Sequence, residues 1–165
     1  MSKETTPPDG IAARHAGASG RRDFVSVTIA DQLFGIPVLQ VQDVLGPQRI
    51  TRIPLAPGEV AGSLNLRGRI VTAIDIRTRL GLPQRSESER AMSVVVDHGG
   101  ELYSLLVDTV GEVLSLDMGD AERNPATLDP VWREVSAGIY RLDGSLLVVL
   151  DVARVLDFST RAAAA

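Results

Sequence analysis

Cysteine is absent from the 165 residues, and lysine and aromatic residues are scarce. Without a thiol the chain has no disulfide, no cysteine nucleophile and no cysteine-ligated zinc or iron–sulfur centre. Aromatic residues make up 4% and the formal net charge is −4, whereas a groove for nucleic acid is basic and lined by stacking platforms. The composition therefore excludes several enzyme classes and argues against nucleic acid as a partner.

Long apolar runs are also missing. No run approaches the roughly 18 residues that a membrane-spanning helix needs, and Met1 to Gly10 lacks the basic and apolar segments of a signal peptide. We therefore expect a cytoplasmic protein without direct membrane insertion. With 44% hydrophobic residues the chain still has enough apolar material for a core.

Residues suited to catalysis are few. The only histidines are His15 and His98, and neither has a partner in a recognisable motif. Asp75 and Asp151 could form an acid–base pair, but each follows a strand and precedes a short apolar helix, which is the position of an N-cap. We expect no enzymatic activity, no metal and no cofactor, and we keep a small β-barrel hydrolase that uses both aspartates as an alternative.

Charge is distributed unevenly along the chain. Residues 46–85 hold seven arginines against two acidic residues, whereas residues 86–165 hold six arginines against fourteen acidic residues. Opposite patches of this kind steer association and suppress wrong partners, so the pattern predicts head-to-tail docking. A patch formed by Arg67, Arg69, Arg77 and Arg79 would be the one surface to favour nucleic acid.

Short runs rich in Val, Ile and Leu, each bounded by turn residues, predict an all-β fold with ten strands and short helices. Helices are expected at residues 75–80 and 151–156, and residues 38–45 fit either a helical turn or a strand. We expect disordered ends at 1–22 and 159–165 and a linker at 84–90, which divides the fold. The predicted strands are Asp23–Ala30, Leu33–Pro37, Gln48–Ile53, Ser63–Leu66, Arg69–Ile74, Met92–His98, Glu101–Val107, Val113–Leu116, Ser136–Leu142 and Ser145–Leu150.

An internal repeat is the strongest signal. A shift of 69 residues aligns Gln32–Leu45 with Glu101–Leu114 at 5 identities in 14 positions, and a shift of 76 aligns Ala61–Leu80 with Ala137–Leu156 at 6 in 20. Turns and hydrophobic positions match as well. The repeat predicts two copies of one small β-unit.

The stretch from Asn65-Leu66-Arg67-Gly68-Arg69 to Ala73-Ile74-Asp75-Ile76-Arg77 resembles the signature of the CheW family of bacterial chemotaxis coupling proteins. Phe34-Gly35-Ile36-Pro37-Val38, Thr51-Arg52-Ile53-Pro54 and Val107-Asp108 agree with further family motifs in the same order. The resemblance implies a CheW-like domain at 23–158, made of two intertwined five-stranded SH3-like β-barrels. We assign the first barrel to about 23–83 and the second to about 91–158.

The resemblance also implies a non-catalytic adaptor. Members of the family couple the cytoplasmic tip of chemoreceptors to the regulatory domain of the histidine kinase CheA, so both are expected partners. The shared two-barrel plan further suggests rings formed with CheA or with copies of this chain. An adaptor of a non-flagellar chemosensory array, controlling pili or development, would fit the same residues.

Site residues follow from the same motifs. Val41, Asp43, Arg67 and Ile70 match receptor-binding positions, and we expect Asp43 and Arg67 to pair across neighbouring strands. The alternative for Arg67 is a solvated turn residue. Gly62 and Gly68 match positions near the kinase-binding edge, although a glycine more commonly marks a turn or a close approach.

Overall fold

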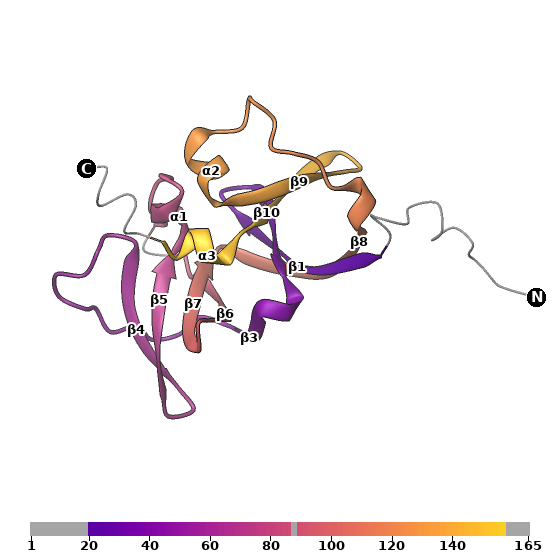
Figure 1. Ribbon diagram of the computed structural model, residues 1–165. Coiled ribbons are helices and arrows are strands. Elements are labelled where there is room, and N and C mark those ends of the chain that lie inside the picture. Colours follow the sequence, from indigo (N-terminus) through magenta and orange to yellow (C-terminus); the bar gives the residue numbers. More distant parts are fainter. Residues whose placement is uncertain (1–19, 87–88, 158–165) are drawn as a thin grey trace, which may run out of the picture.

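The protein, described here by a computed structural model at residues 20–86 and 89–157, is an all-β molecule. Its strands form two five-stranded sheets, which we call barrel A and barrel B (Figure 1). Barrel A has the order β8-β1-β2-β10-β9, and barrel B has β3-β6-β7-β5-β4. The expected fold, two five-stranded β-units with short helices, is confirmed. The elements are β1 (Arg21–Ile29), β2 (Gln32–Pro37), the 3-10 turn η2 (Val38–Gln40), β3 (Val41–Leu45), β4 (Val60–Leu66), β5 (Arg69–Asp75), α1 (Ile76–Arg79), β6 (Met92–His98), β7 (Glu101–Val107), β8 (Thr109–Asp117), η3 (Met118–Asp120), α2 (Pro130–Val135), β9 (Ser136–Leu142), β10 (Ser145–Leu150) and α3 (Val152–Val155).

The two barrels repeat each other strand by strand. Strands β3, β6, β7, β5 and β4 occupy the places in barrel B that β8, β1, β2, β10 and β9 occupy in barrel A. The one parallel pair of each sheet, β2 with β10 and β5 with β7, also falls in the same place. The structure thus accounts for the internal repeat, and it shows that each barrel combines strands from both copies.

This exchange corrects the barrel boundaries of 23–83 and 91–158, which are wrong. Barrel B is the continuous segment from β3 to β7, and barrel A is built from the strands before and after it. The chain crosses between the barrels twice, at η2 and again at Asp108 between β7 and β8. Segment 84–90, expected to divide the fold, connects α1 to β6 within barrel B.

Two smaller predictions need correction, and one helix was missed. Gln48–Ile53 is no strand, since only Thr51 forms an isolated bridge, with Ser63, and the strand lies earlier at Val41–Leu45. Arg21 and Arg22 belong to β1, because β8 extends to Asp117 and pairs with them. Helix α2 was not predicted, although Asp129 caps it and Pro130 occupies its first turn.

The remaining end predictions, disorder at 1–19 and at 159–165, concern residues outside those that the structure describes. The short helices after β5 and β10 are where the sequence placed them. Asp75 accepts a hydrogen bond from Arg77 N, and Asp151 accepts one from Arg154 N. Both aspartates are therefore N-caps, as expected from their position.

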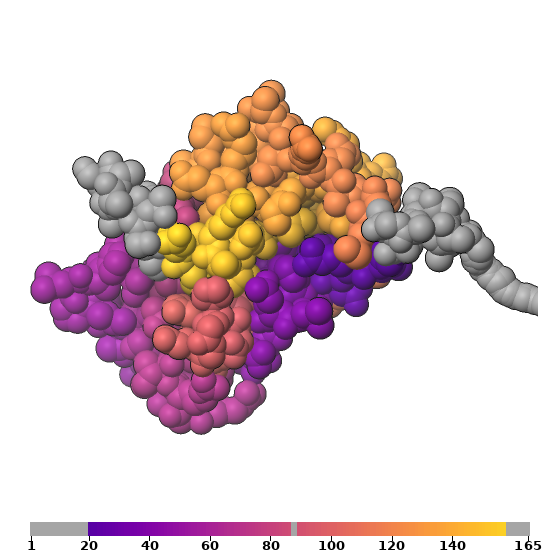
Figure 2. Space-filling model, viewed as in Figure 1, coloured from indigo at the N-terminus to yellow at the C-terminus, as the bar shows by residue number. Residues whose placement is uncertain are grey.

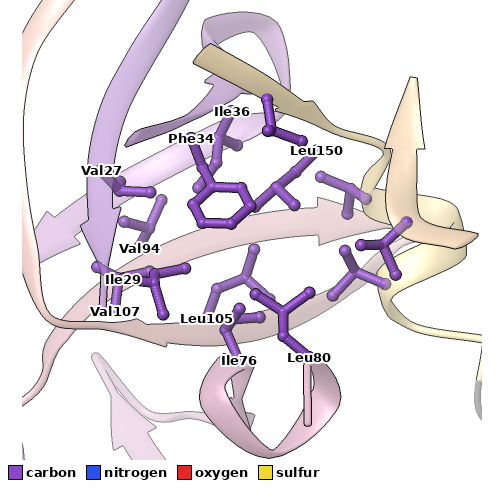
Figure 3. Packing of buried hydrophobic residues seen from close by; sticks show 14 of the residues in the cluster. Val27, Ile29, Phe34, Ile36, Ile76, Leu80, Val94, Leu105, Val107 and Leu150 are labelled. Atoms are coloured by element: carbon purple, nitrogen blue, oxygen red, sulfur yellow. The ribbon is translucent and has the colours of Figure 1, made fainter. Parts of the chain in front are cut away.

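One apolar core joins the barrels. Phe34 and Ile36 from β2 meet Val94 from β6 and Leu105 from β7, with Leu150 from β10 beside them (Figure 3). Each sheet also covers a smaller cluster of its own, around Phe24 and Tyr140 in barrel A and around Leu64 and Val71 in barrel B. Helix α3, yellow in Figure 2, lies between the orange residues of barrel A and the magenta residues of barrel B. The two units are therefore halves of one domain.

Candidate interaction surface

The two edge strands of barrel B, β3 and β4, face each other without a continuous ladder. The segment after β3 closes the gap at one point, where Thr51 and Ser63 exchange two backbone hydrogen bonds of 2.8 Å each. The equivalent bridge in barrel A joins Glu122 to Ile139. The turn between β4 and β5 lies at the far end of the same edge.

Arg67 lies in the tight turn between β4 and β5. Leu66 pairs with Arg69, so Arg67 and Gly68 are the two central residues, and their φ angles are +51° and +84°. Two positive φ angles define the type I′ turn that suits a hairpin. Asn65 supports the turn by accepting a hydrogen bond from Gly68 N at 3.0 Å. The turn directs the Arg67 side chain toward β3.

Arg67 forms the expected ion pair with Asp43. Its Nη2 lies 2.9 Å from Asp43 Oδ2, and the side chains are 76% and 24% exposed, respectively. We expected the two residues to lie on neighbouring strands. Instead, Asp43 lies on β3 and Arg67 follows β4, and these two strands are the opposite edges of the sheet. Arg67 also lies exposed in a turn, as the alternative interpretation of this residue expected. The pair bridges the open edge of the barrel.

Two apolar residues near this pair in the sequence are exposed. Ile70, three residues after Arg67, is 70% exposed, and Val44, next to Asp43, is 39% exposed. Val41 differs, because it is half-buried and packs against the shared core. The residues expected at the receptor site therefore divide into an exposed group and one supporting residue.

Further exposed apolar residues were not identified from the sequence. Leu39 in η2 is 96% exposed, and Leu55 in the loop before β4 is 104% exposed with a φ of +64°. Val113 on β8 is also exposed. Nothing in the local sequence separates these residues from core positions, since their exposure depends on the sheet face that Val113 occupies and on the path of the turns that hold Leu39 and Leu55.

The two glycines expected at the kinase-binding edge have different environments. Gly62 is buried with a φ of +150°, and a Cβ there would lie 2.2 Å from the Thr51 carbonyl oxygen. Gly68 is exposed in the hairpin turn, with no atom within 4 Å of such a Cβ. Gly62 is required by a close approach of two segments, and Gly68 by backbone conformation.

A cluster of charged side chains occupies the second crossing between the barrels. Asp108 accepts hydrogen bonds from Arg77 at 2.7 and 3.0 Å, from Arg85 at 3.0 Å and from Ala30 N at 2.8 Å. Burial alone raises the pKa of Asp108, but the hydrogen bonds from Arg77 and Ala30 and the charges of Arg85 and Arg77 outweigh it, so this pKa lies below its ordinary value. The hydrogen bond to Asp108 raises the pKa of Arg77.

The predicted patch of four arginines does not form. Arg79 is 3% exposed and donates to the carbonyl oxygens of Val155 and Arg154, at 3.0 and 2.9 Å. The Arg77 side chain is 12% exposed and paired with Asp108. Only Arg67 and Arg69 remain at the surface. The feature that most favoured nucleic acid is thus removed.

The aspartates of the alternative hydrolase lie in different barrels. Asp75 borders a cavity of about 450 Å³ beneath the loop before β4, where it caps α1 and faces Arg85 at 3.5 Å. Asp151 caps α3 and is not among the residues that line this cavity. Within 20–86 and 89–157, no group of three or more His, Asp or Glu side chains could hold a metal ion. None of the helices in these ranges is long and apolar enough to cross a membrane.

Comparison with known proteins adds independent evidence. The model of the CheW-like domain family matches residues 23–159. A chemotaxis protein CheW of Klebsiella aerogenes is 30% identical over 142 residues, which cover 86% of each chain. One of Rhizobium meliloti is 27% identical and covers 93% of this chain and 98% of its own. The crystal structure of the scaffolding protein TtCheW from Thermoanaerobacter tengcongensis superposes with a TM-score of 0.71 at 29% identity, covering 79% of this chain and 89% of that one.

Proposed function

Because the chain belongs to the CheW-like domain family, we propose that it is a non-catalytic chemotaxis adaptor that couples chemoreceptors to the histidine kinase CheA. The match across both barrels carries this proposal, since it spans residues 23–159 and therefore nearly the whole fold. The adaptor would act on the cytoplasmic side, at the tips of membrane-bound receptors. Asp75 and Asp151 serve as helix caps, which supports a binding function over a hydrolytic one.

The receptor would bind at the open edge of barrel B. The ion pair between Asp43 and Arg67 and the exposed Ile70 of the same hairpin offer a charged and an apolar contact. This combination suits an amphipathic helix that lays its apolar face against the sheet. Val41 would support the surface from below, because it packs into the core.

The kinase would bind at the edge that contains Gly62 and Gly68. Gly62 would act indirectly, since it is buried and allows Thr51 to bridge to Ser63. Gly68 would act through the shape of the hairpin turn, where it is exposed. These two residues therefore shape a contact surface and need not touch the partner themselves.

Charge supports head-to-tail assembly with CheA or with copies of the chain. Residues 46–85 lie in barrel B, and four of their seven arginines, Arg49, Arg52, Arg67 and Arg69, are exposed. Residues 108–157 lie in barrel A and hold four arginines against ten acidic residues. Complementary ends of this kind favour a heterologous contact, which closes into a ring when the rotation allows.

Calorimetric titration of the full chain tests the proposal. We expect saturable binding to the CheA regulatory domain and, separately, to a receptor-tip fragment, with weaker kinase binding at higher salt. Arg67→Asn should keep the turn, because Asn tolerates a positive φ, and should weaken receptor binding while kinase binding is unchanged. Arg141→Asn, which removes an exposed ion pair of barrel A, is the control. A folded protein that binds neither partner at any salt concentration would refute the proposal.

A further inference from the structure

The two crossings between the barrels are equivalent by the repeat but differ in chemistry. The 69-residue shift places Leu39 at the position of Asp108. Leu39 is 96% exposed in η2, whereas the Asp108 side chain is 19% exposed. One crossing is therefore an open apolar turn, and the other is fixed by a carboxylate.

Asp108 connects elements of both barrels. Its Oδ2 accepts the Ala30 N–H at 2.8 Å, in the turn between β1 and β2 of barrel A. The same carboxylate accepts both Nε and Nη2 of Arg77, from α1 of barrel B, at 3.0 and 2.7 Å. A backbone hydrogen bond from Asp108 N to Thr28 O, at 3.1 Å, adds a second link to barrel A.

Arg85 completes the cluster from the segment that follows α1. Its Nε lies 3.0 Å from Asp108 Oδ1, and its Nη1 lies 3.5 Å from Asp75 Oδ1. Arg77 also donates from Nη1 to Pro83 O at 2.9 Å, which ties this segment to α1. The Arg85 side chain is 10% exposed and that of Arg77 is 12% exposed. Two arginines and two aspartates thus neutralise each other in a nearly buried site.

The repeat has no second copy of this cluster. The 76-residue shift places Asp151 at the position of Asp75 but Ala153 at that of Arg77. The bidentate arginine is therefore present at one crossing only. An arrangement required merely to complete a barrel would be expected in both copies.

Hydrogen bonds between the barrels can specify their relative orientation, because such bonds are directional. Apolar burial is non-directional, so the hydrogen bonds between the barrels, those of Asp108 and those of Arg79 to α3, add a specific orientation to what the packed core provides. A bidentate arginine–carboxylate pair adds geometric specificity. Replacing a buried ion pair by apolar residues often leaves the stability of the protein unchanged. The contribution of such a pair is therefore to the orientation of the elements it joins.

We propose that Asp108 is a positioning residue: with Arg77 and Arg85 it fixes the angle between barrels A and B, and this angle determines how strongly a receptor on barrel B influences the head-to-tail contact that barrel A makes with the kinase. The second half of the inference rests on the proposed function. The first half concerns the free protein and is tested without any partner.

The angle is measured by pulsed electron paramagnetic resonance between two spin labels. Cysteine is absent, so Glu101→Cys in barrel B and Asp143→Cys in barrel A provide the only two labelling sites, both exposed. Asp108→Asn should shift or broaden the distance distribution in the full chain. Glu122→Gln, which breaks an ion pair of 3.0 Å within barrel A, should leave it unchanged. Coincident distributions for Asp108→Asn and the unsubstituted chain would overturn the inference.

A milder variant covers the case in which Asp108→Asn does not fold. Arg85→Gln removes one donor to Asp108 and leaves the Arg77 pair in place. It should broaden the distribution to a smaller extent, and an unchanged distribution would again overturn the inference. Arg77→Lys keeps the positive charge but cannot form the bidentate pair. Its distribution of spin-label distances should therefore be as broad as that of Asp108→Asn.

The coupling half is tested with receptor, adaptor and kinase together. Asp108→Asn should lower receptor-dependent activation of the kinase about five-fold, the low end of usual allosteric coupling, while each separate affinity stays within about two-fold. Equal losses in the separate affinities would refute a coupling role. If the unsubstituted chain binds neither partner, the proposed function and the coupling half both fail, whereas the spin-label distances still decide the positioning half.

Discussion

At the scale of single residues, two glycines of one hairpin provide a matched comparison. An alanine Cβ at Gly62 would lie 2.2 Å from the Thr51 carbonyl oxygen, and backbone atoms cannot move away easily. We expect Gly62→Ala to lower the free energy of unfolding by about 2 kcal/mol or more. Gly68→Ala meets no neighbour and should lower it by only about 1 kcal/mol, the usual effect of a positive φ. Urea unfolding measures both, and equal losses would contradict this explanation.

The Asp108 carboxylate should make stability depend on pH in acid. Its pKa in the folded protein is lower than its ordinary value, so its contribution is complete above the unfolded pKa of about 4 and is lost as the pH falls through the folded value. The difference in unfolding free energy between the unsubstituted chain and Asp108→Asn should therefore be constant from neutral pH down to about pH 5 and narrow below about pH 4. Denaturant unfolding at several pH values measures this difference. A difference independent of pH would show that Asp108 is not charged in the fold.

At the scale of elements, α3 depends on a residue from the other barrel. The helix has four residues, too few to be stable alone. Arg79 from α1 donates to the carbonyl oxygens of Val155 and Arg154 at its end. Terminal carbonyls of a helix need such partners when they are buried.

Replacing Arg79 should therefore loosen α3 before the rest of the molecule. Arg79→Met keeps much of the side-chain volume but removes both hydrogen bonds. We expect faster amide hydrogen exchange at Val155 and Leu156, with little change in the strands. Arg141→Met, at an exposed residue in barrel A, is the control. Uniform acceleration across the strands would instead indicate a global loss of stability.

The elements also show how far the sequence could predict this fold. Alternating hydrophobic runs and turn residues predicted most strands, and the repeat predicted two related units, because both signals are local or depend on direct comparison of segments. The exchange of strands was not predictable in this way. A repeat says that two segments fold alike, and it does not say which copy of a strand pairs with which.

In the candidate site, too, some residues could be identified from the sequence and others could not. The resemblance identified Asp43 and Arg67, and the structure brings them to 2.9 Å. The partners of Arg77 and Arg79 escaped prediction because they lie 31 and 76 residues away in sequence. Two arginines that seemed to continue a surface patch are instead buried by the fold. Long-range ion pairs of this kind need the topology before they can be assigned.

At the scale of the whole molecule, the shared core should make the two barrels unfold together. The core contains Ile74 and Leu105 from barrel B and Phe34 and Leu150 from barrel A, all fully buried. We expect one cooperative transition, seen at the same denaturant concentration by Trp132 fluorescence and by circular dichroism. Trp132 reports on barrel A, because its ring lies 5.5 Å from that of Phe34.

Excision of barrel B tests this dependence directly, since its strands form the continuous segment 41–107. Alone, the fragment would expose the faces of Ile74, Val94 and Leu105 that β2 and β10 cover in the whole chain. Roughly 65 residues also bury too small a share of their surface to tolerate such a loss. We therefore expect a poorly dispersed amide spectrum for fragment 41–107 and a dispersed one for the full chain. A folded fragment would show that barrel B does not need the shared core to fold.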